Sequence, residues 1–269
     1  MASKQRTIEK EVSLSGVGLH TGKDVKLTFK PAPENHGFAF IRTDLEGSPV
    51  IEAKADYVTD TQRGTNLEKN GVKIHTSEHV LAAVVGSGID NIIIEIDAPE
   101  PPIMDGSSKF FIEALEQAGL KEQEATVEEY IVKDVISYKD ESTGSEIILM
   151  PSDEYQVTTM VDFGTKVLGT QNATLEHISD FKEEIAAART FSFLHEIEML
   201  LDNDLIKGGD LNNAIVYVDK PLSEATMKKL RVAFKKEDVH VKPNGILDNL
   251  NLHWPNDCLL YTSPSPRDA

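Results

Sequence analysis

The sequence predicts an α+β fold of two similar domains, each with a mainly antiparallel sheet packed against helices. Strand-like segments precede helical segments in residues 1–120, and the same order returns in the second half of the chain. Between the halves, residues 121–129 (KEQEATVEE) are polar and acidic, which is typical of a linker. We therefore expect one domain over residues 1–124 and a second over residues 125–257.

The strands of the first domain are indicated by alternation and by turn residues. Residues 24–30 alternate Val25, Leu27 and Phe29 with polar neighbours, as a strand with one buried face does. Residues 38–41 and 91–96 are also rich in strand formers. The dipeptide Asn70-Gly71 predicts a tight hairpin, because both central positions of such a turn need positive φ.

Two helices are expected in the same domain. Thr76 or Ser77 is suited to cap a helix that runs to residue 85. A second helix is expected over residues 107–118, and Gly119 suits the left-handed position that follows a helix.

The second half has the same sequence of signals. Strands are expected at residues 130–138, 146–150, 155–163 and 214–218, and helices from about residue 179, over 191–201 and over 222–234. The chain contains no clear internal sequence repeat. The similarity of the two domains is therefore predicted from topology alone.

The last twelve residues, 258–269 (CLLYTSPSPRDA), differ from the rest of the chain. They contain a Ser-Pro-Ser-Pro run and no helical or strand period. They resemble the translation of a sequencing-library transposon adapter, and we expect a non-native tail; a natural disordered tail is the alternative.

Composition excludes several classes of protein. The formal charge of −18 opposes the phosphate neutralisation on which nucleic-acid binding depends. The sequence contains no apolar run long enough for a membrane span and no secretory signal, so we expect a cytoplasmic protein. Cys258 is the only cysteine, so a metal ion would need His, Asp or Glu ligands.

Residues 75–79 (HTSEH) match the His-x-x-Glu-His pattern of zinc peptidases. His75 follows a strand-like segment and precedes the expected helix cap, so we expect it to point away from His79. The four-apart pairs His20 with Asp24 and His253 with Asp257 are the other candidates for two ligands on one helix face. Gly22 and Pro255 oppose a helix in these two segments, which favours ordinary loop histidines.

Six motifs in order resemble those of the UDP-3-O-acyl-N-acetylglucosamine deacetylase family, over residues 4–257. They are Gln5-Arg6-Thr7-Ile8, residues 16–22 (GVGLHTG), 76–83 (TSEHVLAA), 88–91 (GIDN), 99–107 (PEPPIMDGS) and 188–193 (ARTFSF). The resemblance implies an active site between two α+β domains. It also implies a soluble enzyme of lipid A biosynthesis whose substrate is an acylated UDP-amino-sugar.

The resemblance assigns a role to three polar residues. His79 matches the first zinc ligand, and Glu78 matches the general base that takes a proton from the attacking water. Thr190 matches the hydroxyl that stabilises the oxyanion. Amide hydrolysis needs such groups, because an amide is a poor electrophile and its leaving amine must be protonated. Read individually, the three residues are a buried histidine at a helix start, a first-turn acid and a hydroxyl at a helix boundary.

Four further residues are candidates for substrate binding. Leu19, Phe191 and Phe193 are candidates to line a groove for the acyl chain, and ordinary core packing is the alternative for each. Gly209, next to Gly208, is a position where the backbone can approach a neighbour closely.

The sequence departs from the family after residue 257. Family members continue with a His-Lys-x-x-Asp helix that supplies two more zinc ligands and then with a further histidine that acts as the general acid; this sequence contains neither. We therefore expect a truncated second domain, weak zinc binding and an inactive fragment. The alternative is a non-catalytic protein that binds a nucleotide-sugar or an acyl chain. Residues 242–257 also resemble the form of the family fused to an acyl-carrier-protein dehydratase.

Overall fold

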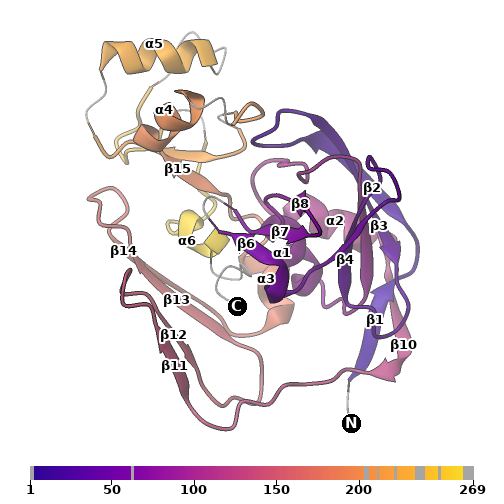
Figure 1. The fold of residues 1–269 in the computed structure, drawn as a ribbon. Coiled ribbons are helices and arrows are strands. Elements are labelled where there is room, and N and C mark those ends of the chain that lie inside the picture. Colours follow the sequence, from indigo (N-terminus) through magenta and orange to yellow (C-terminus); the bar gives the residue numbers. More distant parts are fainter. Residues whose placement is uncertain are drawn as a thin grey trace.

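The computed structural model describes residues 3–61, 64–202, 206–210, 212–220, 223–233, 240–247 and 250–262. Most of the N-terminal half is one strand-rich body, and the second half extends from it as two less regular parts (Figure 1).

A five-stranded sheet is the centre of the N-terminal half. In spatial order its strands are β2 (Val12–Val17), β3 (Asp24–Pro31), β9 (Ile92–Ile96), β4 (Phe38–Arg42) and β5 (Val50–Glu52). Neighbours pair antiparallel except β4 with β9, which are parallel. Val25, Leu27 and Phe29 are buried on one face of β3, which confirms the alternation predicted for residues 24–30.

The two helices predicted for this half are present as α1 (Glu78–Gly86) and α2 (Lys109–Ala118). They contact each other and pack beside the sheet (Figure 1). The rings of Phe29 in β3 and Phe111 in α2 meet edge to face, with 6.5 Å between their centroids. Gly119, at the end of α2, has a φ of 73°, the positive value expected of this glycine.

A three-stranded antiparallel sheet precedes α1. It consists of β6 (Val58–Asp60), β7 (Asn66–Lys69) and β8 (Val72–Ile74), and the short helix η1 (Ala55–Tyr57) leads into it. Asn70 and Gly71 connect β7 to β8 with φ values of 53° and 79°. The predicted tight hairpin is confirmed.

The polar segment predicted as a linker begins instead as a strand. β10 (Leu120–Thr126) pairs antiparallel with β1 (Lys4–Ile8), so the boundary after residue 124 falls inside a strand. The Glu34 carboxylate also accepts the backbone N–H groups of Glu124 and Ala125. Polar composition failed to predict the strand because most β10 side chains are exposed and its backbone partners are more than a hundred residues away.

The second half contains three separate two-stranded sheets among its described residues. They are β11 (Ile136–Lys139) with β12 (Glu146–Leu149), β13 (Val157–Asp162) with β14 (Thr170–Leu175), and β15 (Phe191–Phe193) with β16 (Ile215–Tyr217). The first two are antiparallel hairpins and the third is parallel. The α and β mixture is as predicted, whereas the described strands do not form a second sheet like that of the N-terminal half.

The helices of the second half are short. They are η2 (Ile178–Asp180), α3 (Phe181–Glu184), α4 (Leu194–Asp202), α5 (Glu224–Ala233) and α6 (Asp257–Thr262). The helix predicted over residues 191–201 was wrong at its start, because residues 191–193 pair with residues 215–217 before α4 begins. The helix predicted over 222–234 is confirmed for α5, and residues 222 and 234 lie outside the described residues.

Part of the tail predicted to have no regular structure is helical. Cys258 and Leu259 in α6 are fully buried, and α6 contacts β14 (Figure 1). Two adjacent leucines after Cys258 provide enough apolar surface for this short helix to be buried. Residues 263–269 lie outside the described residues, and the non-native origin of the tail stays a prediction.

One apolar core crosses the expected domain boundary. Phe181, Ala188 and Leu259 of the second half belong to the same buried cluster as Phe29 and Phe111. The segment from η2 to residue 188 therefore packs against the N-terminal body.

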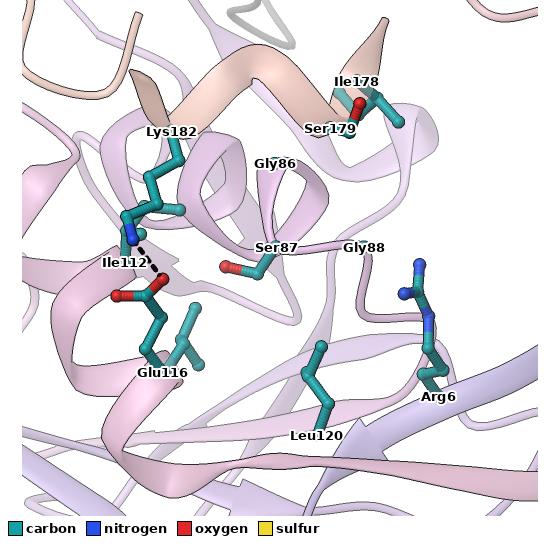
Figure 2. A pocket seen from close by; sticks show the side chains of 11 residues that line it. Arg6, Gly86, Ser87, Gly88, Ile112, Glu116, Leu120, Ile178, Ser179 and Lys182 are labelled. Carbon is teal, nitrogen blue, oxygen red and sulfur yellow. Dashed lines mark ion pairs between the residues drawn. The ribbon is translucent and has the colours of Figure 1, made fainter.

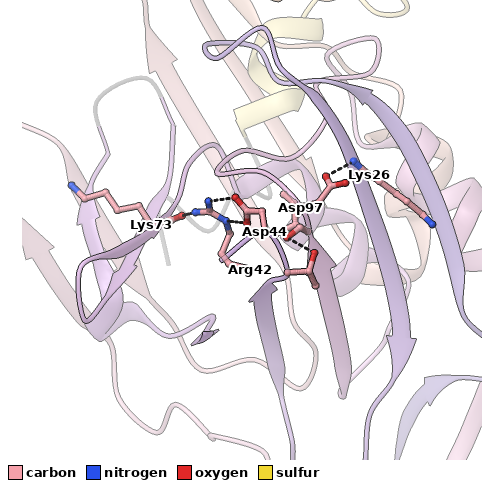
Figure 3. A network of polar contacts seen from close by, with 7 residues as sticks. Lys26, Arg42, Asp44, Lys73 and Asp97 are labelled. Carbon is pink, nitrogen blue, oxygen red and sulfur yellow. Dashed lines mark hydrogen bonds and ion pairs between the residues drawn. The ribbon is translucent and has the colours of Figure 1, made fainter. Parts of the chain in front are cut away.

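A polar network fixes the ends of the central strands (Figure 3). The Arg42 guanidinium at the end of β4 donates two hydrogen bonds of 2.7 and 2.8 Å to Asp44 and one of 2.8 Å to the carbonyl of Lys73. The backbone N–H of Lys26 donates to Asp97 at 2.7 Å. None of the described helices is long and apolar enough to cross a membrane.

Candidate active site

The start of α1 carries the two central candidates, Glu78 and His79. Both side chains are almost completely buried, with exposed fractions of 1% and 4%. The Glu78 Oε2 atom accepts the backbone N–H of Thr65 at 2.8 Å, which ties the helix start to the loop before β7. The His79 carbonyl accepts the Ser108 hydroxyl at 3.0 Å, which ties it to the start of α2.

Ser77 is the N-cap residue of α1, as predicted, but its side chain makes no capping hydrogen bond. The Ser77 hydroxyl donates to the Thr65 carbonyl at 2.8 Å, and the Thr76 hydroxyl donates to Glu100 at 3.1 Å. Both hydroxyls are thus oriented by acceptors outside the helix, and the Ser77 hydroxyl accepts no N–H of the first turn. Thr76 also has a φ of 52°, which is rare for a β-branched residue.

His75 precedes α1 and lies outside the helix, as predicted. Its Nδ1 atom is 3.3 Å from the Asn66 side-chain oxygen, and burial lowers the pKa of the imidazole. The helical pairing of ligands that a zinc peptidase requires is therefore absent at residues 75 and 79.

Thr190 is attached by backbone hydrogen bonds to the segment that precedes α2 and to β16. Its backbone N–H donates to the Gly106 carbonyl at 2.8 Å, and its carbonyl accepts the N–H of Ile215 at 2.9 Å. A Cβ on Gly106 would stand 2.1 Å from the carbonyl oxygen of Asn213, so only glycine permits this approach. Residues 106–108 thus connect Thr190 with His79 through Ser108.

The candidate groove residues divide between two apolar clusters. Leu19 packs partly buried against the cluster that contains Leu194, Ile197 and Leu200. Phe191 and Phe193 pack against the cluster around Ile215 and Tyr217, with their own rings 5.8 Å apart. The structure therefore does not place Leu19 and the two phenylalanines in one described apolar cluster.

The close backbone approach occurs at Gly208 as well as Gly209. The Gly208 N–H donates to the Leu19 carbonyl at 3.0 Å, and a Cβ there would stand 2.3 Å from the Gly18 oxygen. Gly209 makes a local turn, with its N–H donating to the Ile206 carbonyl at 2.8 Å. Gly208 brings the second half against the loop that carries Leu19.

The other histidine pairs are not helical, as predicted. His20 lies in the turn between β2 and β3, and His253 lies in a bend before α6. The backbone N–H of His253 donates to Asp257 at 3.1 Å, and burial raises the pKa of the Asp257 carboxyl. Neither pair presents two side chains on one helix face.

Sequence reasoning assigned no role to Glu100, although it lies in a quoted motif. Its side chain is fully buried and accepts hydrogen bonds from His20, Thr21 and Thr76. The signal in the sequence was an acidic residue between two prolines, Pro99 and Pro101. A carboxylate in such surroundings is buried only when hydrogen bonds replace its water.

The described residues do not form a zinc site by themselves. Nowhere in residues 3–61, 64–202 and the later described ranges do three or more His, Cys, Asp or Glu side chains gather in a way that could hold a metal ion. His79 is the only described residue that the family motif matches to a ligand, whereas a catalytic zinc site uses about three protein ligands.

A cavity of about 310 Å³ lies at the other end of α1 (Figure 2). Gly86, Ser87 and Gly88 form one wall, and Arg6 and the 2.6 Å ion pair between Lys182 and Glu116 lie at its sides. It contains none of the predicted site residues.

Comparison with known proteins gives a consistent result over most of the chain. The sequence profile described as UDP-3-O-acyl N-acetylglycosamine deacetylase (LpxC) matches residues 5–248. A bifunctional enzyme LpxC/FabZ of Bacteroides thetaiotaomicron is 46% identical over 255 residues, which cover 95% of this chain and 55% of that protein. The corresponding Porphyromonas gingivalis enzyme is 45% identical over 254 residues, covering 94% and 55%.

A relative without the second name matches over a shorter range. The UDP-3-O-acyl-N-acetylglucosamine deacetylase of Myxococcus xanthus is 44% identical over 213 residues, which cover 79% of this chain and 67% of that protein. The chain spans about half the length of the bifunctional relatives, at 55% of each.

Proposed function

The chain belongs to the UDP-3-O-acyl N-acetylglycosamine deacetylase family of lipid A biosynthesis, and from this we propose that it carries part of a zinc-dependent amide hydrolase. The proposed substrate is UDP-3-O-acyl-N-acetylglucosamine, from which the enzyme removes the N-acetyl group. The observation that carries the proposal is the position of buried Glu78 and His79 at the start of α1, linked through residues 106–108 to Thr190.

In the proposed reaction Glu78 is the general base. Its carboxylate takes a proton from the water that attacks the acetyl carbon, while the Thr190 hydroxyl donates a hydrogen bond to the oxygen that becomes negative. The carbon–nitrogen bond then breaks, and the proton that Glu78 took from the water is transferred to the leaving amine, so that acetate and the free amine are the products.

The proposal identifies one zinc ligand in this chain, His79. His79 would supply one imidazole, and the described residues bring no three His, Cys, Asp or Glu side chains together as a complete zinc site would need. No catalytic step is therefore assigned through the metal.

The proposed active site lies between the two halves of the chain, which meet after β10. The contacts of Gly208 with Leu19 and of Thr190 with Gly106 support this, because each joins one half to the other beside the candidate residues. Leu19, Phe191, Phe193 and Gly209 are proposed as substrate-binding residues on the two sides. The name shared by the bifunctional relatives supports a second proposal, that this sequence belongs to a form fused to a dehydratase.

The test is a chimera in which residues 1–257 are followed by the remaining C-terminal part of the Bacteroides thetaiotaomicron relative. Acetate release from UDP-3-O-acyl-N-acetylglucosamine should occur, and a zinc chelator should abolish it. The 269-residue chain is assayed in parallel. Binding of the substrate without acetate release by the chimera would favour the alternative, a non-catalytic nucleotide-sugar or acyl-chain binding protein.

A further inference from the structure

Glu100 is a buried carboxylate that joins three segments of the N-terminal half. Its Oε2 atom accepts the backbone N–H groups of His20 at 3.0 Å and Thr21 at 3.1 Å. Its Oε1 atom accepts the Thr76 hydroxyl at 3.1 Å and lies 3.2 Å from the His20 nitrogen. The three segments are the loop between β2 and β3, the residue before Ser77 and α1, and the chain after β9.

These hydrogen bonds account for the burial of the charge. The Glu100 side chain is 0% exposed, and no Lys or Arg forms an ion pair with it in the described part of the chain. Burying an ionised group is unfavourable unless hydrogen bonds replace its water. Hydrogen bonds to a carboxylate are stronger than hydrogen bonds between neutral groups. The loop and the residue before the N-cap of α1 are therefore both firmly attached to Glu100.

Any side chain at position 18 would displace the Glu100 or Thr21 side chain from this arrangement. A Cβ on Gly18 would stand 2.8 Å from the Glu100 Oε2 atom and 2.5 Å from the Thr21 hydroxyl oxygen. Two backbone contacts reinforce the attachment: Gly18 pairs with Pro102, and the N–H of Ile103 donates to the Val17 carbonyl at 2.9 Å. The chain after Glu100 is thus joined to the loop by backbone as well as side-chain contacts.

Thr76 shows what the attachment does to α1. Thr76 has a φ of 52°, an unfavourable value for a β-branched residue. Such a backbone conformation persists only where surrounding contacts impose it. The Thr76 hydroxyl bonds to Glu100, and its neighbour His75 donates a backbone hydrogen bond of 2.8 Å to Pro99. Thr76 is two residues before Glu78, so its backbone conformation sets the direction in which Glu78 and His79 leave the turn.

We propose that Glu100 is a positioning residue that fixes the loop carrying Leu19 and the start of α1 in one relative arrangement. The proposal rests on the proposed function, which assigns Glu78 and His79 to the chemistry and Leu19 to substrate binding. Glu100 acts through these residues and does not itself touch the reacting atoms.

The test is amide hydrogen exchange on the 269-residue chain, followed residue by residue. Glu100→Gln keeps the shape of the side chain but replaces one acceptor oxygen with a donor. Its remaining oxygen can still face His20 and Thr21 but carries no charge, so exchange at both amides should accelerate by about 10-fold, the difference between a hydrogen bond to a charged and to a neutral acceptor. Glu95→Gln is the matched control, because Glu95 on β9 forms an ion pair of 2.7 Å with Lys30 on β3 and makes no contact with the loop that the structure records. It should leave both amides unchanged.

A second pair of variants, at Thr76, tests the same proposal if the Glu100→Gln variant does not fold. Thr76→Val removes only the hydroxyl donor and should accelerate exchange at residues 75–77, whereas Thr76→Ser keeps the donor and should restore protection. Unchanged exchange at His20 and Thr21, or equal acceleration throughout the N-terminal half, would overturn the proposal, as would equal behaviour of the two Thr76 variants.

The exchange result does not depend on turnover. An inactive chimera would refute the proposed deacetylase while leaving local protection by Glu100 in place. Unchanged local exchange in a chimera that remains active would refute the positioning role alone. In the active chimera, Glu100→Gln should also lower kcat, because Glu78 and His79 lose their fixed direction.

Discussion

Gly86, in the last turn of α1, lies against the ring of Phe181 at the start of α3. A Cβ at position 86 would stand 2.1 Å from the Phe181 Cδ1 atom, far inside van der Waals contact. Phe181 is 1% exposed and belongs to the core of the N-terminal half. This contact is where the second half is anchored to the helix that carries Glu78 and His79.

We expect Gly86→Ala to destabilise the protein despite the higher helix propensity of alanine. Alanine gains about 1 kcal/mol over glycine in a helix, whereas overpacking a core costs about 1–3 kcal/mol and more where a ring cannot move away. The measurement is urea unfolding. Val85→Ala is the control, since Val85 is 42% exposed on the same helix and its truncation should change stability by about 0.5 kcal/mol or less. A more stable Gly86→Ala variant would contradict the contact.

Glu78→Gln should abolish most turnover of the chimera without loss of zinc. Glutamine retains an oxygen that can accept the Thr65 N–H, so the helix start is preserved while the base is removed. Loss of a general base lowers kcat by about 10²- to 10⁴-fold. Glu113→Gln, on the exposed side of α2, is the control. Parallel loss of metal and activity in Glu78→Gln would make Glu78 a ligand.

Thr190→Val should lower kcat with little change in KM. Valine is close to threonine in shape, and the backbone bonds of residue 190 to Gly106 and Ile215 do not involve the side chain. Removing an oxyanion donor costs on the order of 10²-fold in kcat. Thr174→Val, on the exposed face of β14, should have no effect. A change confined to KM would place the Thr190 hydroxyl in substrate binding instead.

Local patterns predicted the N-terminal half well. The alternation of Val25, Leu27 and Phe29 and the dipeptide Asn70-Gly71 each specify their own backbone geometry, and the structure agrees at both. Such signals act over a few residues, so they do not depend on knowing which distant segment lies beside them.

Long-range pairing is where sequence reasoning failed. Residues 191–193 form a strand because residues 215–217 lie alongside them, and the predicted linker is a strand because β1 is its partner. At the site, the motifs singled out Glu78, His79 and Thr190, whose roles stay proposals. The partners of Glu100 were not predictable, since it meets backbone groups of His20 and Thr21 some eighty residues away.

The Arg42–Asp44 pair should make stability depend on pH. The Arg42 hydrogen bonds are the main cause that holds the pKa of Asp44 below its usual value. A lowered folded-state pKa means that the stabilisation is fully present above the unfolded value of about 3.9 and is lost as pH falls through the folded value. Asp44→Asn should therefore destabilise the protein at pH 7 by about 1–3 kcal/mol, with a smaller difference near pH 3.

The pH dependence is measured by urea unfolding of the wild type and Asp44→Asn from pH 7 to pH 3. Asp56→Asn is the control, because Asp56 is exposed in η1, and its difference from the wild type should stay near zero. An Asp44→Asn difference that is the same at pH 3 and pH 7 would show that the pair contributes through packing rather than through charge.

The 269-residue chain should bind zinc weakly. A zinc ion in a catalytic site uses about three protein ligands, and the described residues bring no three suitable side chains together. His75 is held outside α1 near Asn66, and the His20 and His253 segments are a turn and a bend, so none of them presents a second imidazole beside His79 on a helix. Dialysis against trace zinc followed by metal analysis should give much less than one ion per chain. The chimera should hold about one ion, and His79→Ala should remove it, because the site then loses one of about three ligands. One tightly held zinc per 269-residue chain, lost on His79→Ala, would show that this sequence assembles a complete site from residues that the structure does not bring together.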